Sequence, residues 1–146
     1  DVGGFDTGLR TAEDLDFHLR VALRWKIGVI ERPLTRAMRG HQGLSALART
    51  YHDYMIVVER FVRDHRGEIP EVDRKAALLM AYTRNARGLL WDGDYRGALR
   101  LSAQSTLMVQ GMSDARELGR LGGHFARKLA ADARQRVRRA FAARPR

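Results

Sequence analysis

Apolar residues recur at helical spacing along most of the chain after residue 45. In residues 46–66 they follow the three- and four-residue spacing of one helix face, at Leu47, Tyr51, Tyr54, Met55, Val58, Phe61 and Val62. Further stretches with this pattern cover residues 71–91, 95–109, 113–121 and 124–142. They are separated by turn-like residues, namely Gly67 with Pro70, Asp92-Gly93-Asp94 and Gly122-Gly123. The pattern therefore predicts an all-helical segment from residue 46 onward.

The first 45 residues have a different pattern. Glycines indicate a loop over residues 1–10, after which Thr11 can cap a helix that runs to about residue 26 and has acidic residues in its first turn. Residues 27–30 (Ile-Gly-Val-Ile) predict a short strand, and residues 34–45 a second extended piece. One helix and one or two strands cannot bury a sufficient core alone. We therefore expect this segment to belong to a larger α/β domain.

The expected organisation has three parts. Residues 1–45 form the end of an α/β domain, residues 46–123 a helical accessory domain, and residues 124–146 a basic amphipathic helix or tail. The pair of helices around Asp92-Gly93-Asp94 resembles one tetratricopeptide-like hairpin, whereas a solenoid needs about three. The chain opens on Asp1 with neither an initiator Met nor a signal region, so we interpret it as a piece of a longer protein.

Composition excludes several classes of protein. Hydrophobic residues make up 45% of the 146 residues, a share typical of globular proteins rather than disordered ones. No apolar run approaches the roughly 18 residues that a membrane span needs. The absence of cysteine excludes disulfides, Cys-ligated metals and a thiol nucleophile.

The positive charge is concentrated at the C-terminal end. The chain has 27 Lys and Arg against 17 Asp and Glu, a formal net charge of +10. Residues 127–146 alone contain eight of the basic residues and one acid, Asp132, so they account for +7. A polyanionic partner, if there is one, is therefore expected at the tail rather than at the body of the chain.

An ordered set of motifs lies in the first segment: G-G-F-D at residues 3–6, Leu9, E-D-L-D at residues 13–16, and Arg20. The set resembles the acceptor-side motif of family 2 glycosyltransferases of the GT-A fold. The similarity continues through residues 27–33, where the family has a strand. It extends to residues 38–45, which contain Arg39, His41 and Ser45 and are similar to the family's R-x-H…S segment. The resemblance covers about residues 1–45, under a third of the chain.

This resemblance implies an enzyme that transfers a sugar from a nucleotide-diphosphate sugar, with inversion. Asp14 would be the general base that takes the proton of the acceptor hydroxyl, and Glu13 a neighbouring positioning carboxylate. Carboxylates at a helix N-terminus suit this role because the helix dipole favours negative charge there. Gly4 and Arg39 are assigned to substrate binding, Gly4 as a permissive loop residue near the acceptor and Arg39 facing the diphosphate. His41 is assigned to the metal or the diphosphate.

The resemblance also implies a divalent cofactor, Mg²⁺ or Mn²⁺. In the family its main ligands form a D-x-D motif at the end of an earlier strand, in an N-terminal part that is missing here. D-L-D at residues 14–16 and D-G-D at residues 92–94 do not follow an apolar strand, so neither is assigned to the metal. We expect the 146-residue fragment alone to be inactive, because the nucleotide-binding half is missing.

The expected partners are the nucleotide-sugar donor and a glycan, lipid-linked or small-molecule acceptor, as in the biosynthesis of cell-envelope polysaccharides. A cytoplasmic location is expected, with peripheral contact at the inner face of the membrane through residues 124–146 as an extension of it. The donor sugar, the acceptor, the linkage and the oligomeric state stay open.

Other interpretations remain. Residues 46–142 could form a non-enzymatic helical interaction module, in which case the acids at the start of the first helix would be ordinary. Thr11-x-x-Asp14 also fits a capping box, and Asp16 and Arg20 have the spacing of an i,i+4 ion pair. The basic tail fits a solvated end, a membrane-surface helix or a nucleic-acid binder, although the aromatic pattern that accompanies many nucleic-acid sites is missing.

Overall fold

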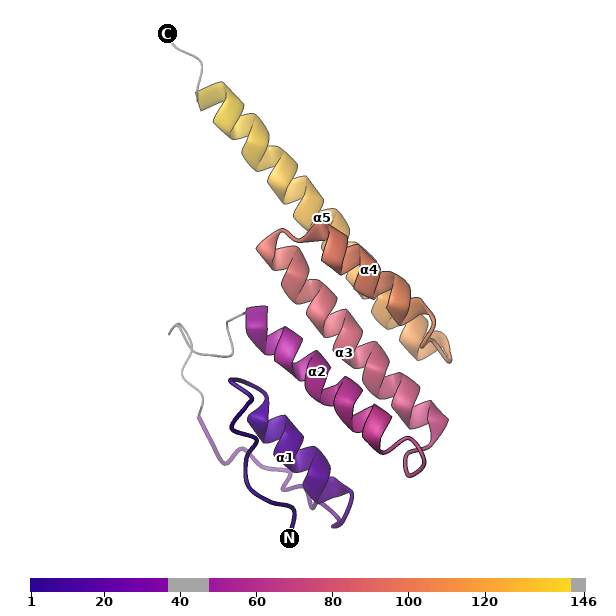
Figure 1. Cartoon of the computed structure of the whole chain (residues 1–146). Coiled ribbons are helices and arrows are strands. Elements are labelled where there is room, and N and C mark those ends of the chain that lie inside the picture. Colours follow the sequence, from indigo (N-terminus) through magenta and orange to yellow (C-terminus); the bar gives the residue numbers. More distant parts are fainter. Residues whose placement is uncertain (37–47, 143–146) are drawn as a thin grey trace. The chain divides into compact units, whose positions relative to one another are not determined.

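The computed structural model describes residues 1–36 and 48–142, which contain five helices and no strand (Figure 1). The helices are α1 (Glu13–Ala22), α2 (Ala48–Asp64), α3 (Glu71–Asp92), α4 (Tyr95–Thr106) and α5 (Met112–Ala142). The mainly helical class is therefore confirmed for this part of the chain. The chain divides into two compact units, Asp1–Pro70 and Glu71–Arg146.

The strand expected at residues 27–30 is wrong. These residues have no regular secondary structure, and Ile27, Val29 and Ile30 are 57%, 84% and 64% exposed. A strand needs a neighbour to pair its backbone groups, and none of the described residues supplies one. Of the second extended piece, residues 34–36 also lack regular structure, and the rest lies outside the described residues.

In the first unit, α1 packs against α2, which follows it in the chain. The expected cap of α1 by Thr11 is wrong. Ala12 occupies the N-cap position in a left-handed conformation (φ 63°), and no side chain caps the helix. Thr11 is instead buried, and its hydroxyl donates a hydrogen bond of 2.8 Å to Asp53 of α2. A hydrogen bond from the loop before α1 to α2 thus uses the hydroxyl that a local cap would have used.

The second unit is built on a hairpin of α3 and α4, with α5 packed against both. The hairpin expected around residues 92–94 is confirmed. Gly93 adopts φ +85° where α3 ends, and the Asp94 side chain caps α4 by accepting the N–H of Gly97 at 2.9 Å. Ala86 and Ala98 are fully buried, and such small side chains allow close helix packing.

The sequence analysis placed boundaries between the catalytic part, the accessory domain and the tail at residues 45 and 123, and these boundaries stay predictions. In terms of contacts, α2 belongs with α1 in the first unit. Residue 123 lies within a continuous helix, so the expected break between a short helix and a last helix at Gly122-Gly123 is wrong. Two glycines each cost a helix about 1 kcal/mol, which the apolar stripe through the buried Leu121 can offset.

The continuous α5 makes a direct prediction for Gly122. We expect Gly122→Ala to stabilise the second unit by roughly 0.5–1 kcal/mol, because alanine lowers the conformational entropy of the unfolded chain and its added Cβ would meet nothing within 4 Å. Urea unfolding followed by circular dichroism measures this change. Gly93→Ala is the matched control and should destabilise by about 1–2 kcal/mol, because φ is positive there. A loss of stability in Gly122→Ala would contradict the continuous helix.

Within residues 1–36 and 48–142, no helix is both long enough and apolar enough to cross a membrane.

Candidate functional site

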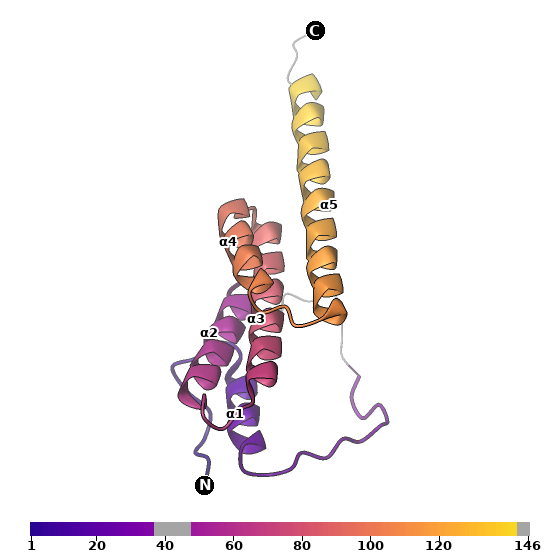
Figure 2. The same cartoon turned by 90° about the vertical axis from the view of Figure 1, so that its right-hand side faces the viewer.

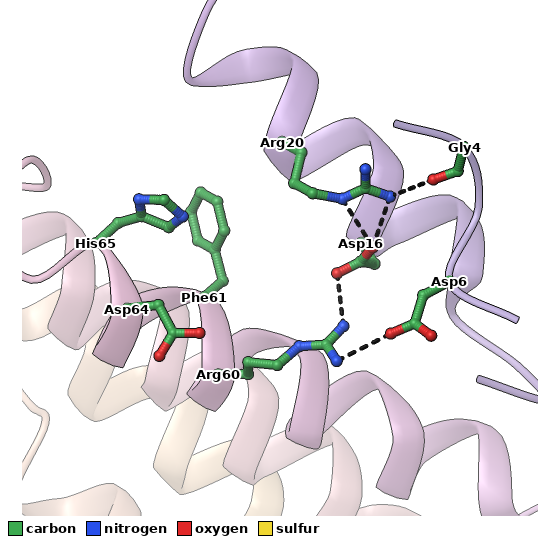
Figure 3. A pocket seen from close by; sticks show the side chains of 8 residues that line it. All are labelled: Gly4, Asp6, Asp16, Arg20, Arg60, Phe61, Asp64 and His65. Atoms are coloured by element: carbon green, nitrogen blue, oxygen red, sulfur yellow. Dashed lines mark hydrogen bonds and ion pairs between the residues drawn. The ribbon is translucent and has the colours of Figure 1, made fainter. Parts of the chain in front are cut away.

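The glycine-containing loop at the start of the chain is tied to α1 by Arg20. The Arg20 guanidinium donates a hydrogen bond of 2.7 Å to the carbonyl oxygen of Gly4 (Figure 3). It also donates to the carbonyl oxygen of Val2. It also pairs with Asp16 at 2.8 Å, which confirms the i,i+4 pair expected from the sequence. Arg20 therefore holds residues 2–4 against the helix that starts with Glu13 and Asp14.

A second arginine, Arg60 of α2, connects the same elements. Its two terminal nitrogens donate to Asp6 at 2.9 Å and to Asp16 at 2.7 Å (Figure 3). Arg60 thus joins the loop, α1 and α2. The sequence analysis missed Arg60, because it lies 44 residues from Asp16 along the chain. The available signal was a charged residue next to Phe61 of the predicted apolar helix face.

Two carboxyls in this region are held in the ionised form. The pKa of Asp6 is lowered by the backbone N–H of Gly8 and then by Arg60. Burial would raise the pKa of Asp53, but hydrogen bonds from Thr11 and Arg49 outweigh it and leave the pKa below its ordinary value. Asp6 and Asp53 are therefore stabilising groups of the first unit rather than proton acceptors near neutral pH.

A hollow of about 320 Å³ lies within the first unit beside Arg20 and Arg60. Its lining comprises Gly4, Asp6, Asp16, Arg20, Arg60, Phe61, Asp64 and His65, which Figure 3 shows from close by. The rings of Phe61 and His65 are in tilted contact with their centroids 4.9 Å apart, and His65 hydrogen-bonds Glu68 at 2.8 Å. The hollow has a polar, mixed-charge wall of a kind that can accept a hydroxyl-rich ligand.

Glu13 and Asp14 occupy the first turn of α1 but do not line this hollow. Asp14 is exposed, and its carboxylate accepts the N–H of Leu15 at 2.8 Å. Asp14 and Asp16 diverge by about 200° around the helix axis, so the ion pairs of Asp16 with Arg20 and Arg60 do not extend to Asp14. In the described part of the chain, neither Glu13 nor Asp14 forms an ion pair.

Of the other expected site residues, only Gly4 is among the described residues. Gly4 lines the hollow, and Arg20 binds its carbonyl oxygen. Arg39 and His41 lie outside the described residues, so their assigned roles stay predictions. Among residues 1–36 and 48–142, no group of three or more His, Asp or Glu side chains is arranged to hold a metal ion.

Comparison with known proteins gives no relatives. No protein-family model, no curated protein and no solved structure matches this chain.

Proposed function

We propose that residues 1–45 are the acceptor-side part of a family 2 glycosyltransferase, with Asp14 as the general base. One observation carries the proposal beyond the sequence resemblance. Asp6, Asp16 and Asp53 are held by arginines or by Thr11, whereas Glu13 and Asp14, the two acids that the resemblance selects, form no ion pair in the described residues. A base must keep its carboxylate free to receive a proton from substrate.

The chemistry assigned to Asp14 is proton removal from the acceptor hydroxyl as that oxygen attacks the anomeric carbon of the donor sugar. The bond from that carbon to the nucleotide diphosphate breaks, and the diphosphate leaves with the bonding electrons. The N-terminal turn of α1 favours the negative charge that Asp14 needs before the transfer. Arg20 acts as a positioning residue, because from the last turn of α1 it holds the loop that contains Gly4 against this helix.

The proposed cofactor is Mg²⁺ or Mn²⁺, which would neutralise the leaving diphosphate. The described residues do not fit such an ion, since they contain no cluster of three ligands. No step is therefore assigned through a metal at these residues, and the proposed role of His41 rests on the resemblance alone.

The transferase proposal is tested with the protein expressed from its complete gene. It should release nucleoside diphosphate from at least one member of a panel of nucleotide-diphosphate sugars when glycan, lipid-linked and small-molecule acceptors are supplied with Mg²⁺ or Mn²⁺. Product release is followed by a coupled assay, and transfer by mass spectrometry of the acceptor. Failure to bind or turn over any donor of the panel would contradict the proposal.

A second candidate function, contact with an anionic membrane surface, is favoured by the C-terminal half of α5. Figure 2 shows this half extending beyond the ends of α3 and α4. Arg134, Arg136, Arg138 and Arg139 are exposed along it. Each arginine near an anionic bilayer contributes about 1 kcal/mol of attraction, and the attraction weakens with salt.

Flotation with vesicles measures this contact. The chain is expected to float with vesicles that contain roughly 30 mol% of the anionic lipid phosphatidylglycerol. It should not float with vesicles of pure phosphatidylcholine. Changing the four arginines to glutamine should weaken the affinity for these vesicles at least tenfold, since about 1.4 kcal/mol is a factor of ten. As a control, Arg63→Gln changes an exposed arginine of α2 and should leave flotation unchanged. Equal binding of the fourfold variant would rule out this role for α5.

A further inference from the structure

A second hollow, of about 240 Å³, lies within the second unit between α3 and α5. Both helices contribute residues spaced by three or four, so each presents one continuous stripe to it. The stripe of α3 comprises Arg87, Leu90 and Trp91, and that of α5 comprises His124, Arg127, Lys128 and Ala131. Leu90 is 2% exposed, whereas Trp91 is 71% exposed. The hollow thus combines a buried apolar floor with an accessible aromatic wall.

The polar part of this lining is entirely basic. Arg87, Arg127 and Lys128 are cations, and no acidic residue lines the hollow. Arg87 is paired with Glu117, and Lys128 with Asp132 at 3.0 Å, while Asp132 also accepts the hydroxyl of Tyr95. Arg127 has no carboxylate partner among the described residues. One positive charge at the hollow is therefore left without a compensating acid.

The contact of Arg127 with His124 fixes the state of the histidine. Arg127 lies 3.2 Å from Nδ1 of His124 and can only donate, so this nitrogen accepts and His124 is neutral. Burial, followed by the charges of Arg127 and Arg87, lowers the pKa of His124, although Glu117 acts in the opposite direction. Burial alone says nothing about an anion, but the charges of Arg127 and Arg87 give this part of the hollow a positive potential that an anion would relieve.

Arg87 supplies a separate observation. Its Nε is buried and has no hydrogen-bond partner, the one such side-chain nitrogen or oxygen among the described residues. Buried polar groups are nearly always satisfied, so an unpaired N–H beside a hollow indicates a missing acceptor. An oxygen of a bound anion would provide one.

From these observations we propose that the hollow between α3 and α5 binds a small organic anion with a flat apolar body, such as an aromatic carboxylate. The body would lie against Trp91 and Leu90, and the anionic group would lie beside Arg127 and Arg87. The volume is slightly below the 300–1,000 Å³ of sites for drug-sized ligands, so the occupant is compact. This site lies in the second unit and does not depend on the transferase proposal.

The test uses the whole chain with 2-naphthoate as the probe, observed by ¹H–¹⁵N nuclear magnetic resonance. The chain has two tryptophans, Trp91 in the hollow and Trp25 in the first unit, so their indole N–H signals provide a reporter and an internal reference. Naphthoate should shift the Trp91 signal saturably and leave Trp25 unchanged. Binding should be at least tenfold weaker in Arg127→Gln and unaffected in Arg134→Gln, which changes an exposed arginine of the same helix that does not line the hollow.

Four results would overturn the proposal. Equal shifts with the neutral 2-naphthamide would show an apolar groove that does not select anions. Equal shifts with inorganic phosphate would show attraction by charge alone. A Trp91 signal that moves with protein concentration in the absence of probe would show that a second copy of the chain covers the hollow. Ala131→Phe, which adds a ring to the lining, should also block naphthoate, and unchanged binding in that variant would contradict the assigned place.

Discussion

Replacing Asp14 by asparagine is expected to lower the rate of sugar transfer by on the order of 10²–10⁴-fold in the protein expressed from its complete gene. The amide cannot take the proton of the acceptor hydroxyl, while its size and shape are almost those of the carboxylate. Asp14 is exposed, and its bond in the structure is to its own neighbour Leu15, so the fold should be retained. Donor binding, measured by calorimetry, should change by less than threefold because the donor does not need the base.

The controls separate loss of the base from general damage. Asp92→Asn changes an exposed acid of the other D-x-D sequence and should leave the rate unchanged. Glu13→Gln tests the positioning role of its neighbour and should raise the KM for the acceptor more than it lowers kcat. If Asp14→Asn turns over within a fewfold of the unmodified protein, Asp14 is not the base. The transferase assignment itself is decided separately by turnover of the unmodified protein.

The second large effect is expected from Arg60→Met. This change leaves Asp6 and Asp16 without the arginine that joins them, and Asp16 is 9% exposed. A largely buried carboxylate that loses one charged partner costs about 1–3 kcal/mol, and the lower half applies here because Arg60 is about a third exposed and Asp16 keeps Arg20. Urea unfolding in a Trp91→Phe background, followed by the fluorescence of Trp25, reports on the first unit.

The same variant should change the dependence of stability on pH. Because the pKa of Asp6 is below its ordinary value of 3.8, this carboxylate contributes stability that is present above that pH and is lost as the pH falls through its folded-state pKa. Gly8 and then Arg60 cause the lowering, so without Arg60 the pKa of Asp6 rises toward 3.8 and less stability is lost on acidification. Unfolding curves between pH 2 and 6, a range set by about two units around that value, measure the difference.

A matched variant and a double-mutant cycle keep this prediction specific. Arg63→Met changes an exposed arginine of the same helix and should alter stability by less than about 0.5 kcal/mol. Combining Arg60→Met with Asp16→Asn should cost less than the two separate losses together, because the two side chains share one interaction. Strict additivity would show that Arg60 and Asp16 do not stabilise each other.

Local pattern was sufficient for most of the secondary structure. The helical spacing of apolar residues predicted α2, α3 and α4 to within a few residues, and Asp92-Gly93-Asp94 predicted the turn of the hairpin. These features depend on contacts between residues close in sequence, and the spacing of residue types records such contacts directly. For the same reason, the Asp16–Arg20 pair was predictable, since it joins neighbouring turns of one helix.

The candidate site was predictable only in its residue types. The order of glycines and acids in residues 3–20 carries the family resemblance, and it selects Glu13 and Asp14. It does not reveal which of the acidic side chains form ion pairs or hydrogen bonds in the folded chain. That depends on Arg60 and on the pairing of Thr11 with Asp53, contacts that span more than 40 residues.

What the sequence by itself determined is therefore the helices, the hairpin turn and the set of acids at the start of α1. Tertiary structure alone decided that Thr11 bonds α2 instead of capping α1, that α5 continues through Gly122 and Gly123, and that residues 27–30 form no strand. Each of these outcomes depends on whether a partner from another element is present. Long-range contacts decide whether a strand forms and which partner a hydroxyl bonds. The spacing of residues along the chain does not record such contacts.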